Sequence, residues 1–146
     1  MQEWIACVYA FVGCVAFCVI FEMRRWKFIL CAAGIGTVAQ AVYLLLAGLD
    51  SSVTQLLLAT IVTASLAEVF ARILKTPATV FLIIGIIPLV PGSGVYDTME
   101  ALINRDIALF VQEGLSTAAD AGAIAVGSSL VSAVTRILLV RRPPQR

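Results

Sequence analysis

A cluster of proline and glycine interrupts an uncharged stretch of this sequence, and it is the first place where chemistry is expected. Residues 76–96 carry no charge, and the cluster within them consists of Pro88, Pro91, Gly92, Ser93 and Gly94. Proline lacks an amide hydrogen and clashes with the preceding helical turn, so no regular helix crosses this segment. Inside a membrane, the main-chain groups released by such a break need protein or a wet cavity around them. Because breaks of this kind form substrate sites in transporters, we predict a substrate path here.

Tyr96 and Asp97 directly follow the break and are further candidates for the substrate path. Tyrosine is also common at membrane interfaces because it is amphipathic, so its type alone leaves both interpretations open. Both residues lie close to Pro91 and Gly92, which favours a role in the substrate path.

Two carboxylates fall inside apolar segments and are candidates for proton coupling. Glu68 follows an uncharged run, and Asp120 lies about one turn inside the last apolar segment. Ionisable groups inside a membrane are energetically costly and usually functional. Structural alternatives remain open for both, because Glu68 has Arg72 four residues later as an ion-pair partner, and Asp120 suits the first turn of a helix.

The other residue types argue against several chemistries. The chain has no histidine, and no two of its cysteines have metal-ligand spacing; these are Cys7, Cys14, Cys18 and Cys31. We therefore expect no metal site and no cofactor, and we interpret the cysteines as small packing residues. The sequence also lacks a nucleophile–base pair, a phosphate-binding loop and a basic aromatic patch, so we expect neither an enzyme nor a nucleic-acid-binding protein.

The elements that position these residues are expected to be membrane-spanning helices. The 146 residues are 61% hydrophobic with a mean hydropathy of +1.02, which predicts an all-α integral membrane protein with one transmembrane domain over 1–146. The predicted spans are 4–21, 28–49, 53–74, 77–96 and 117–140, and the fourth is broken by the Pro/Gly motif. Because no basic region or cleavage site precedes the first segment, we expect it to remain in the mature protein.

Basic residues mark alternate connections between the predicted spans. All except Arg105 lie around 22–27, around 72–76, or between Arg136 and Arg146. By the positive-inside rule, these regions are cytoplasmic, and the amino terminus, 50–52 and 97–115 are outside. The sequence thus predicts an external amino terminus and a cytoplasmic carboxyl terminus.

The segment after the break has the pattern of a short amphipathic helix. Asp97 and Glu100 have capping-box spacing, apolar residues then recur on one face, and Gly114 suits a helix end. We therefore predict an interfacial helix over about 97–113, lying at the outer membrane surface, with the last span opening after it.

Small or polar faces on the predicted spans favour close helix packing. The residues that we assign to this role are Gly36, Gln40, Ala125 and Ser129. Small side chains let helix backbones approach closely in lipid, and an amide in mid-span can form interhelical hydrogen bonds. Such faces predict dense packing and an oligomer in the lipid bilayer.

The motif from Pro88 through Pro91, Gly92 and Tyr96 resembles that of the threonine/serine exporter (ThrE-type) family, and specifically its small, YjjB-like membrane component. The small-residue segment 121–127 also resembles that family. The resemblance implies a proton-gradient-driven secondary exporter of threonine, serine or related carboxylates such as succinate, in the bacterial inner membrane. It also implies a separately encoded, larger YjjP-like membrane subunit as partner, because the larger half of fused members is missing here.

Two further functions remain open at the level of sequence. A structural or assembly subunit would pack the larger partner without contacting substrate. A homo-oligomeric channel would need no partner for transport.

Overall fold

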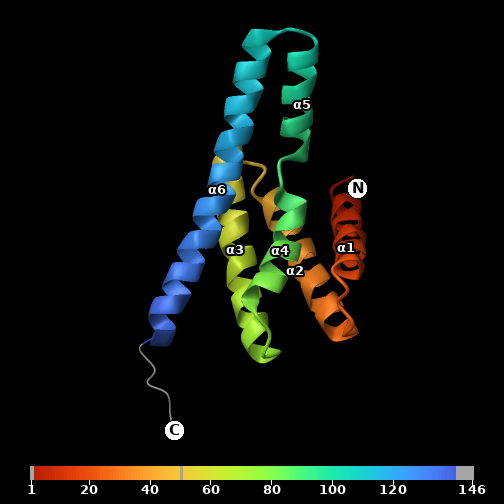
Figure 1. Cartoon of the computed structure of the whole chain (residues 1–146), viewed down its shortest axis with the longest axis vertical. Helices are drawn as coiled ribbons and strands as arrows, with labels where there is room; N and C mark the ends of the chain where they lie inside the picture. Colours follow the sequence, from red (N-terminus) through yellow and green to blue (C-terminus); the bar gives the residue numbers. More distant parts are fainter. Residues whose placement is uncertain (1, 50, 141–146) are drawn as a thin grey trace.

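The computed structural model describes residues 2–49 and 51–140, which form helices joined by short connections (Figure 1). The helices are α1 (Gln2–Ile20), α2 (Trp26–Leu45), α3 (Ser52–Ile73), α4 (Ala78–Ile86), the short 3₁₀ helix η1 (Ile87–Leu89), α5 (Gly92–Ile103) and α6 (Ile107–Val140). The predicted all-α membrane fold is confirmed, with no strand in the described ranges. The basic residues Arg141, Arg142 and Arg146 lie outside the described residues, as does Asp50.

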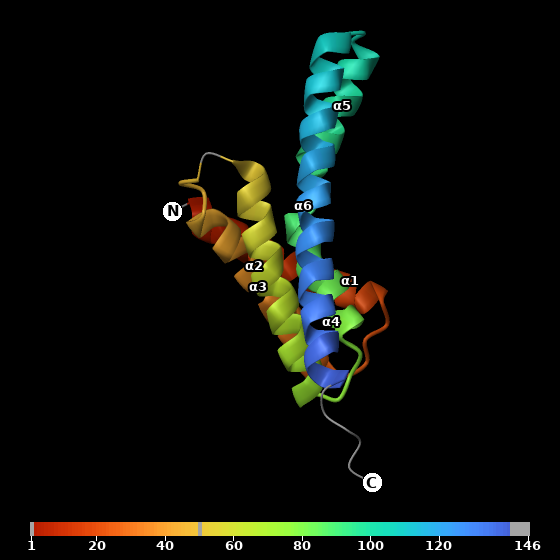
Figure 2. The same cartoon turned by 90° about the vertical axis from the view of Figure 1, so that its left-hand side faces the viewer.

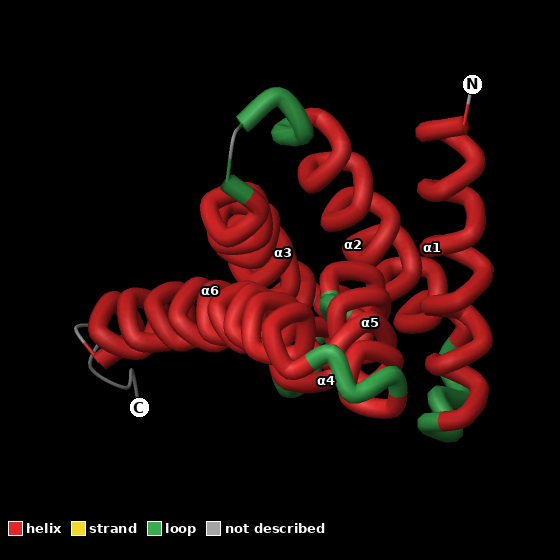
Figure 3. Tube along the Cα trace, turned by 90° about the horizontal axis from the view of Figure 1, so that it is seen from above, coloured by secondary structure: helices red, strands yellow, loops and turns green. Residues whose placement is uncertain are grey.

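The helices form a bundle from which a two-helix hairpin projects (Figures 1 and 2). α2, α3 and α4 pack against one another, α1 covers α2, and the later part of α6 runs beside α3. Figure 3 shows α1 and α6 on opposite sides of this arrangement. α5 packs chiefly against the first part of α6, so these two segments extend beyond the end of α3.

Small side chains fill the centre of the bundle. One buried cluster joins α1, α2, α3 and α4 through Cys14, Cys18, Ala32, Ala67 and Phe81, and a second joins α2, α3, η1 and α6 through Ala39, Leu56, Ala59, Leu89 and Ala123. Cys14 and Cys18 are at most 1% exposed, which supports their interpretation as packing residues. Gly127 brings α6 close to α3, since a Cβ there would lie 3.2 Å from the carbonyl oxygen of Leu57.

The lengths of the helices indicate which of them can cross a membrane. α3 has 22 residues, or about 33 Å, which matches a hydrocarbon core of about 30 Å. α6 has 34 residues, or about 50 Å, and is too long for that core without strong tilt. By length and composition, three described helices are suited to crossing a membrane, or four if α4–η1 and α5, bent by 53°, form one broken span. The apolar stretch Ile5–Ile20 of α1 is shorter, so the first span stays a prediction.

The predicted interfacial helix over 97–113 has the wrong boundaries. α5 begins at Gly92, directly after Pro91, and ends at Ile103, while α6 begins at Ile107 and continues through Gly114. The chain turns at Arg105, whose φ is 59°, and the carboxylate of Asp106 accepts a hydrogen bond from the amide of Leu109 at 3.1 Å. Asp106 therefore acts as the helix-starting residue that the sequence reading assigned to Asp97, and Gly114 is simply tolerated within a helix.

Replacing Gly36 by alanine is expected to destabilise the bundle by about 1–3 kcal/mol, because the new Cβ would collide with Sγ of Cys14. Gly34→Ala is the matched control: it lies in the same helix and gains the same helix propensity, but a Cβ added there would meet no atom within 4 Å. Thermal unfolding in detergent measures the difference. Equal stability of the two variants would contradict the close α1–α2 contact.

Candidate functional site

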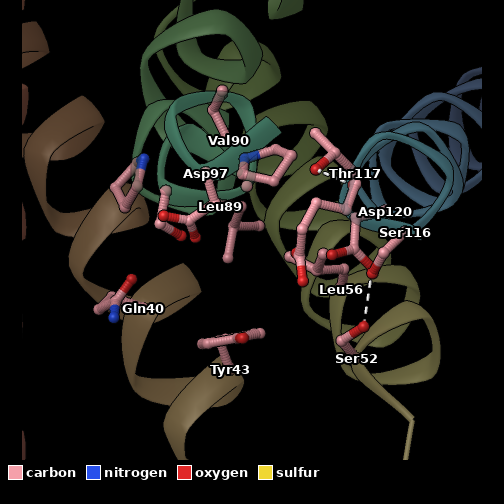
Figure 4. Close-up of a pocket in the computed structure, with 15 residues that line it drawn as sticks. Gln40, Tyr43, Ser52, Leu56, Leu89, Val90, Asp97, Ser116, Thr117 and Asp120 are labelled. Carbon is pink, nitrogen blue, oxygen red and sulfur yellow. Dashed lines mark hydrogen bonds between the residues drawn. The ribbon is translucent and has the colours of Figure 1, made fainter. Parts of the chain in front are cut away.

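The residues of the Pro/Gly break line a cavity of about 380 Å³ between α2, α3, α5 and α6 (Figure 4). Of the residues that the sequence reading singled out, it contains Gln40, Pro88, Pro91, Ser93, Gly94, Asp97 and Asp120. Figure 4 shows Gln40 and Tyr43 of α2 on one side and Ser52, Thr117 and Asp120 on the other. The fold thus brings the break and one of the two candidate carboxylates into one site.

The cavity lies at one end of the bundle. The hydroxyl of Ser52 donates a hydrogen bond to Oδ1 of Asp120 at 2.9 Å, and Ser52 is the first residue of α3. Asp120 therefore lies level with the end of α3, and about 30 Å of α6 remains beyond it, enough to cross the hydrocarbon core. The hairpin of α5 and the start of α6 projects past this level.

The break leaves main-chain donors without acceptors in residues that line the cavity. After the extended residue Val90, the amide of Gly92 donates to the carbonyl oxygen of Val90 at 2.7 Å, and the helical ladder resumes with the amide of Val95 and the carbonyl oxygen of Pro91. The amides of Ser93 and Gly94 find no main-chain acceptor within the described residues. They lie in the first turn of α5, where the helix dipole favours an anion.

Three carboxylates line the same cavity: Asp97, Glu113 and Asp120. Among the residues that the structure describes, the lining contains no lysine or arginine, and its other polar side chains are hydroxyls, a phenol and an amide. The site therefore combines a negative wall with a small group of amide donors. Such a wall attracts a cation or an ammonium group.

Asp120 does not cap a helix, so that interpretation was wrong. α6 begins at Ile107, and Asp120 lies several turns inside it, where its side chain binds Ser52 of α3 instead. The dipole of a helix terminus falls off within one turn, so it does not account for this carboxylate.

Gly94 is where α5 and α6 meet at the cavity. A Cβ on Gly94 would contact Oγ1 of Thr117 at less than van der Waals distance. That hydroxyl donates to the carbonyl oxygen of Glu113 at 2.7 Å, and on the facing helix the hydroxyl of Thr98 donates to the carbonyl oxygen of Gly94 at 2.6 Å. The glycine thus keeps the two helices, and the groups they present, close together.

Several predicted site residues lie outside the cavity. Glu68 lies near the other end of α3, 3.7 Å from Arg72, so the ion pair expected from their spacing is present. Gly92 and Tyr96 do not line the cavity, and the side chain of Tyr96 is 67% exposed.

The predicted packing residues divide between buried and exposed positions. Gly36 lies against Cys14 and Pro88, and Gln40 lines the cavity. Ala125 and Ser129 are exposed in this chain, where α6 instead packs through Ala123, Gly127 and Val131. Contact of Ala125 and Ser129 with another chain stays a prediction.

The sequence reading missed five polar residues of the cavity: Tyr43, Ser52, Glu113, Ser116 and Thr117. Ser52 and Asp120 are 68 positions apart, and only the packing of α3 against α6 makes them neighbours. The spacing of Glu113, Ser116 and Thr117 relative to Asp120 could have identified these three residues. If the last helix starts before Glu113, all four side chains lie on one face of it.

The chain matches a model of a known protein family over most of its length. The family model described as threonine/serine exporter, ThrE, matches residues 6–134. No match was found among curated proteins or among solved structures.

Proposed function

Because the chain belongs to the threonine/serine exporter family, we propose that it is the small subunit of a two-component, proton-driven secondary exporter of threonine and serine, with the cavity beside the Pro/Gly break as its substrate site. The observation that carries the assignment of the site is that three carboxylates and the first turn of α5, whose amides have no main-chain acceptor among the described residues, line one cavity. Membership of an exporter family also argues against an enzyme.

The distribution of charge in the cavity fits a zwitterionic amino acid. The amides of Ser93 and Gly94 are suited to the substrate carboxylate, as in other sites at helix N-termini. Asp120 and its neighbours Asp97 and Glu113 are suited to the ammonium group. Succinate has two carboxylates and no ammonium group, so the same wall would repel it. We therefore propose amino acids rather than dicarboxylates as substrates.

The proton coupling is proposed to act through Asp120, with Glu68 as the second candidate. A protonated Asp120 no longer attracts an ammonium group, so a proton that enters from the outer side would favour release of the substrate there. The titratable groups that share the cavity with Asp120 are Asp97 of α5, Glu113 of α6 and Tyr43 of α2. Glu68 lies far from the cavity and already has Arg72 as a partner.

A larger, YjjP-like membrane subunit is proposed as the partner. In support, much of the apolar surface of the helices faces outward in the single chain, and the small side chains of Ala125 and Ser129 lie on that surface. The proposed orientation, with the cavity toward the outside of the inner membrane, follows from the basic connections at the other end of the bundle.

Vesicles that contain both subunits test the proposed function. They are loaded with labelled threonine, serine or succinate, and efflux is followed after a proton gradient is imposed. We expect threonine and serine to leave at least tenfold faster than succinate, and only when both subunits are present. Efflux from vesicles with the larger subunit alone would favour the assembly role for this chain, and efflux with this chain alone would favour a channel.

A further inference from the structure

A second cavity, of about 550 Å³, lies at the opposite end of the bundle from Ser52 and Asp120. It is formed by the connection between α1 and α2 and by the end of α3, which lie together at the same end in Figures 1 and 2. Four cationic side chains line it: Arg24, Arg25, Lys27 and Lys75. None of the described residues that line it is acidic, so it is a concentrated positive site in a chain whose net charge is only +1.

These cations are not neutralised by the part of the chain that the structure describes. The ion pair found there joins Glu68 and Arg72, neither of which lines the cavity. Glu22 belongs to the same connection but is also absent from the lining. Four like charges around one space repel one another, so an anion bound among them is favoured.

The main chain adds donors for an anion. The amides of Trp26 and Lys27, at the start of α2, have no acceptor within the described residues, whereas the amide of Phe28 donates to the carbonyl oxygen of Arg25. The guanidinium of Arg25 lies over the ring of Phe28 at 5.8 Å, which restricts its position. A phosphate among these groups would receive hydrogen bonds from fixed amides as well as from flexible side chains.

The remaining lining is apolar, which distinguishes a lipid headgroup from free phosphate. It consists of Trp26, Phe28, Ile73 and Leu74, and the side chains of Trp26 and Ile73 are 71% and 67% exposed. A smaller, mainly apolar cavity of about 170 Å³ includes Met23, which directly precedes Arg24, together with Val80 and Ile83 of α4. Acyl chains can cover these surfaces, but inorganic phosphate cannot.

We propose that this basic cavity binds the headgroup of an anionic phospholipid, with the phosphate among Arg25, Lys27, Lys75 and the first amides of α2, and the acyl chains against Trp26 and Ile73. Basic pockets between helices at a membrane surface bind such headgroups, and tryptophan is enriched at that depth. A lipid held there would join the end of α3 to the start of α2. This proposal does not depend on the substrate of the exporter.

Quenching of Trp26 by brominated lipid tests the proposal. The chain contains two tryptophans, so Trp4→Phe leaves Trp26 as the single tryptophan, whose fluorescence is followed. The protein is reconstituted into phosphatidylcholine vesicles that contain increasing fractions of dibrominated phosphatidylglycerol. A second series, in which the phosphatidylcholine is brominated and the phosphatidylglycerol is not, is the reference. The binding constant of phosphatidylglycerol relative to phosphatidylcholine follows from the two quenching curves. We expect phosphatidylglycerol to bind near Trp26 much more tightly than phosphatidylcholine.

Lys27→Gln combined with Lys75→Gln is expected to lower that relative constant about 30-fold, since each charge near a membrane surface contributes about a factor of five. Arg136→Gln is the matched control, because it removes a basic residue of α6 that does not line the cavity. Circular dichroism verifies that each variant is folded. Equal quenching by both lipids would overturn the proposal, and so would an equal loss in the control. Displacement of phosphatidylglycerol by millimolar inorganic phosphate would overturn it as well, and would identify the site as one for free phosphate.

Discussion

Asp120→Asn is expected to lower threonine efflux at least tenfold while the protein still folds and assembles. The carboxylate of Asp120 accepts the hydrogen bond from Ser52. In the proposed function, it also binds the ammonium group of the substrate. Hydrogen bonds to charged groups contribute about 1.5–3 kcal/mol, which corresponds to about 10- to 150-fold in substrate affinity. Asparagine keeps the shape and can still accept the hydrogen bond from Ser52, so the loss would come from the charge.

The pH dependence of efflux separates a coupling role from simple binding. In the wild type, a proton gradient should accelerate efflux, and Asp120→Asn should remove that acceleration even at saturating threonine. Glu68→Gln is the comparison, because it neutralises the other candidate carboxylate, and we expect it to alter efflux only a few-fold. If Glu68→Gln abolished the gradient effect and Asp120→Asn did not, coupling would have to be assigned to the opposite end of α3.

The two carboxylates illustrate what the sequence could predict about the site. An acidic residue in an apolar segment is visible in the sequence, so both Glu68 and Asp120 could be chosen, and the local i, i+4 pair with Arg72 was also predictable. The partner of Asp120 was not, because Ser52 is 68 positions away and depends on how two helices pack. Local interactions follow from spacing, whereas interhelical ones require the packing itself.

The helix boundaries show the same difference between local effects and effects of packing. The apolar runs and the break at Pro88 and Pro91 predicted α2, α3 and α4 to within a few residues, since proline and charge have strong local effects. The boundary between α5 and α6 was misplaced because Asp97 and Asp106 are both acceptable helix-starting residues by type. The chain turns at the second, where Arg105 adopts a positive φ and α5 can fold back on α6.

Gly94→Ala is expected to reduce threonine efflux at least tenfold by separating α5 from α6 at the cavity. The added methyl group would meet Oγ1 of Thr117, which is held by its hydrogen bond to the carbonyl oxygen of Glu113 and has little freedom to move. Overpacking of this kind costs about 1–3 kcal/mol, and the helix can relieve it only by shifting the first turn of α5. That turn carries the amides of Ser93 and Gly94, so the proposed carboxylate site would move with it.

Gly92→Ala is the matched control for this substitution, two residues earlier in the same turn. No atom lies within 4 Å of a Cβ on Gly92, and its φ is not in the left-handed region, so alanine is accommodated without strain. We expect Gly92→Ala to export normally, and we expect Thr117→Ala to restore efflux in the Gly94→Ala background, because it removes the oxygen that the methyl group meets. Efflux is measured in the two-subunit vesicles with subunit assembly as the check. Normal export by Gly94→Ala alone would show that the contact between Gly94 and Thr117 is not needed for transport. Equal losses of efflux in Gly92→Ala and Gly94→Ala would mean that transport requires flexibility of the break and not this contact.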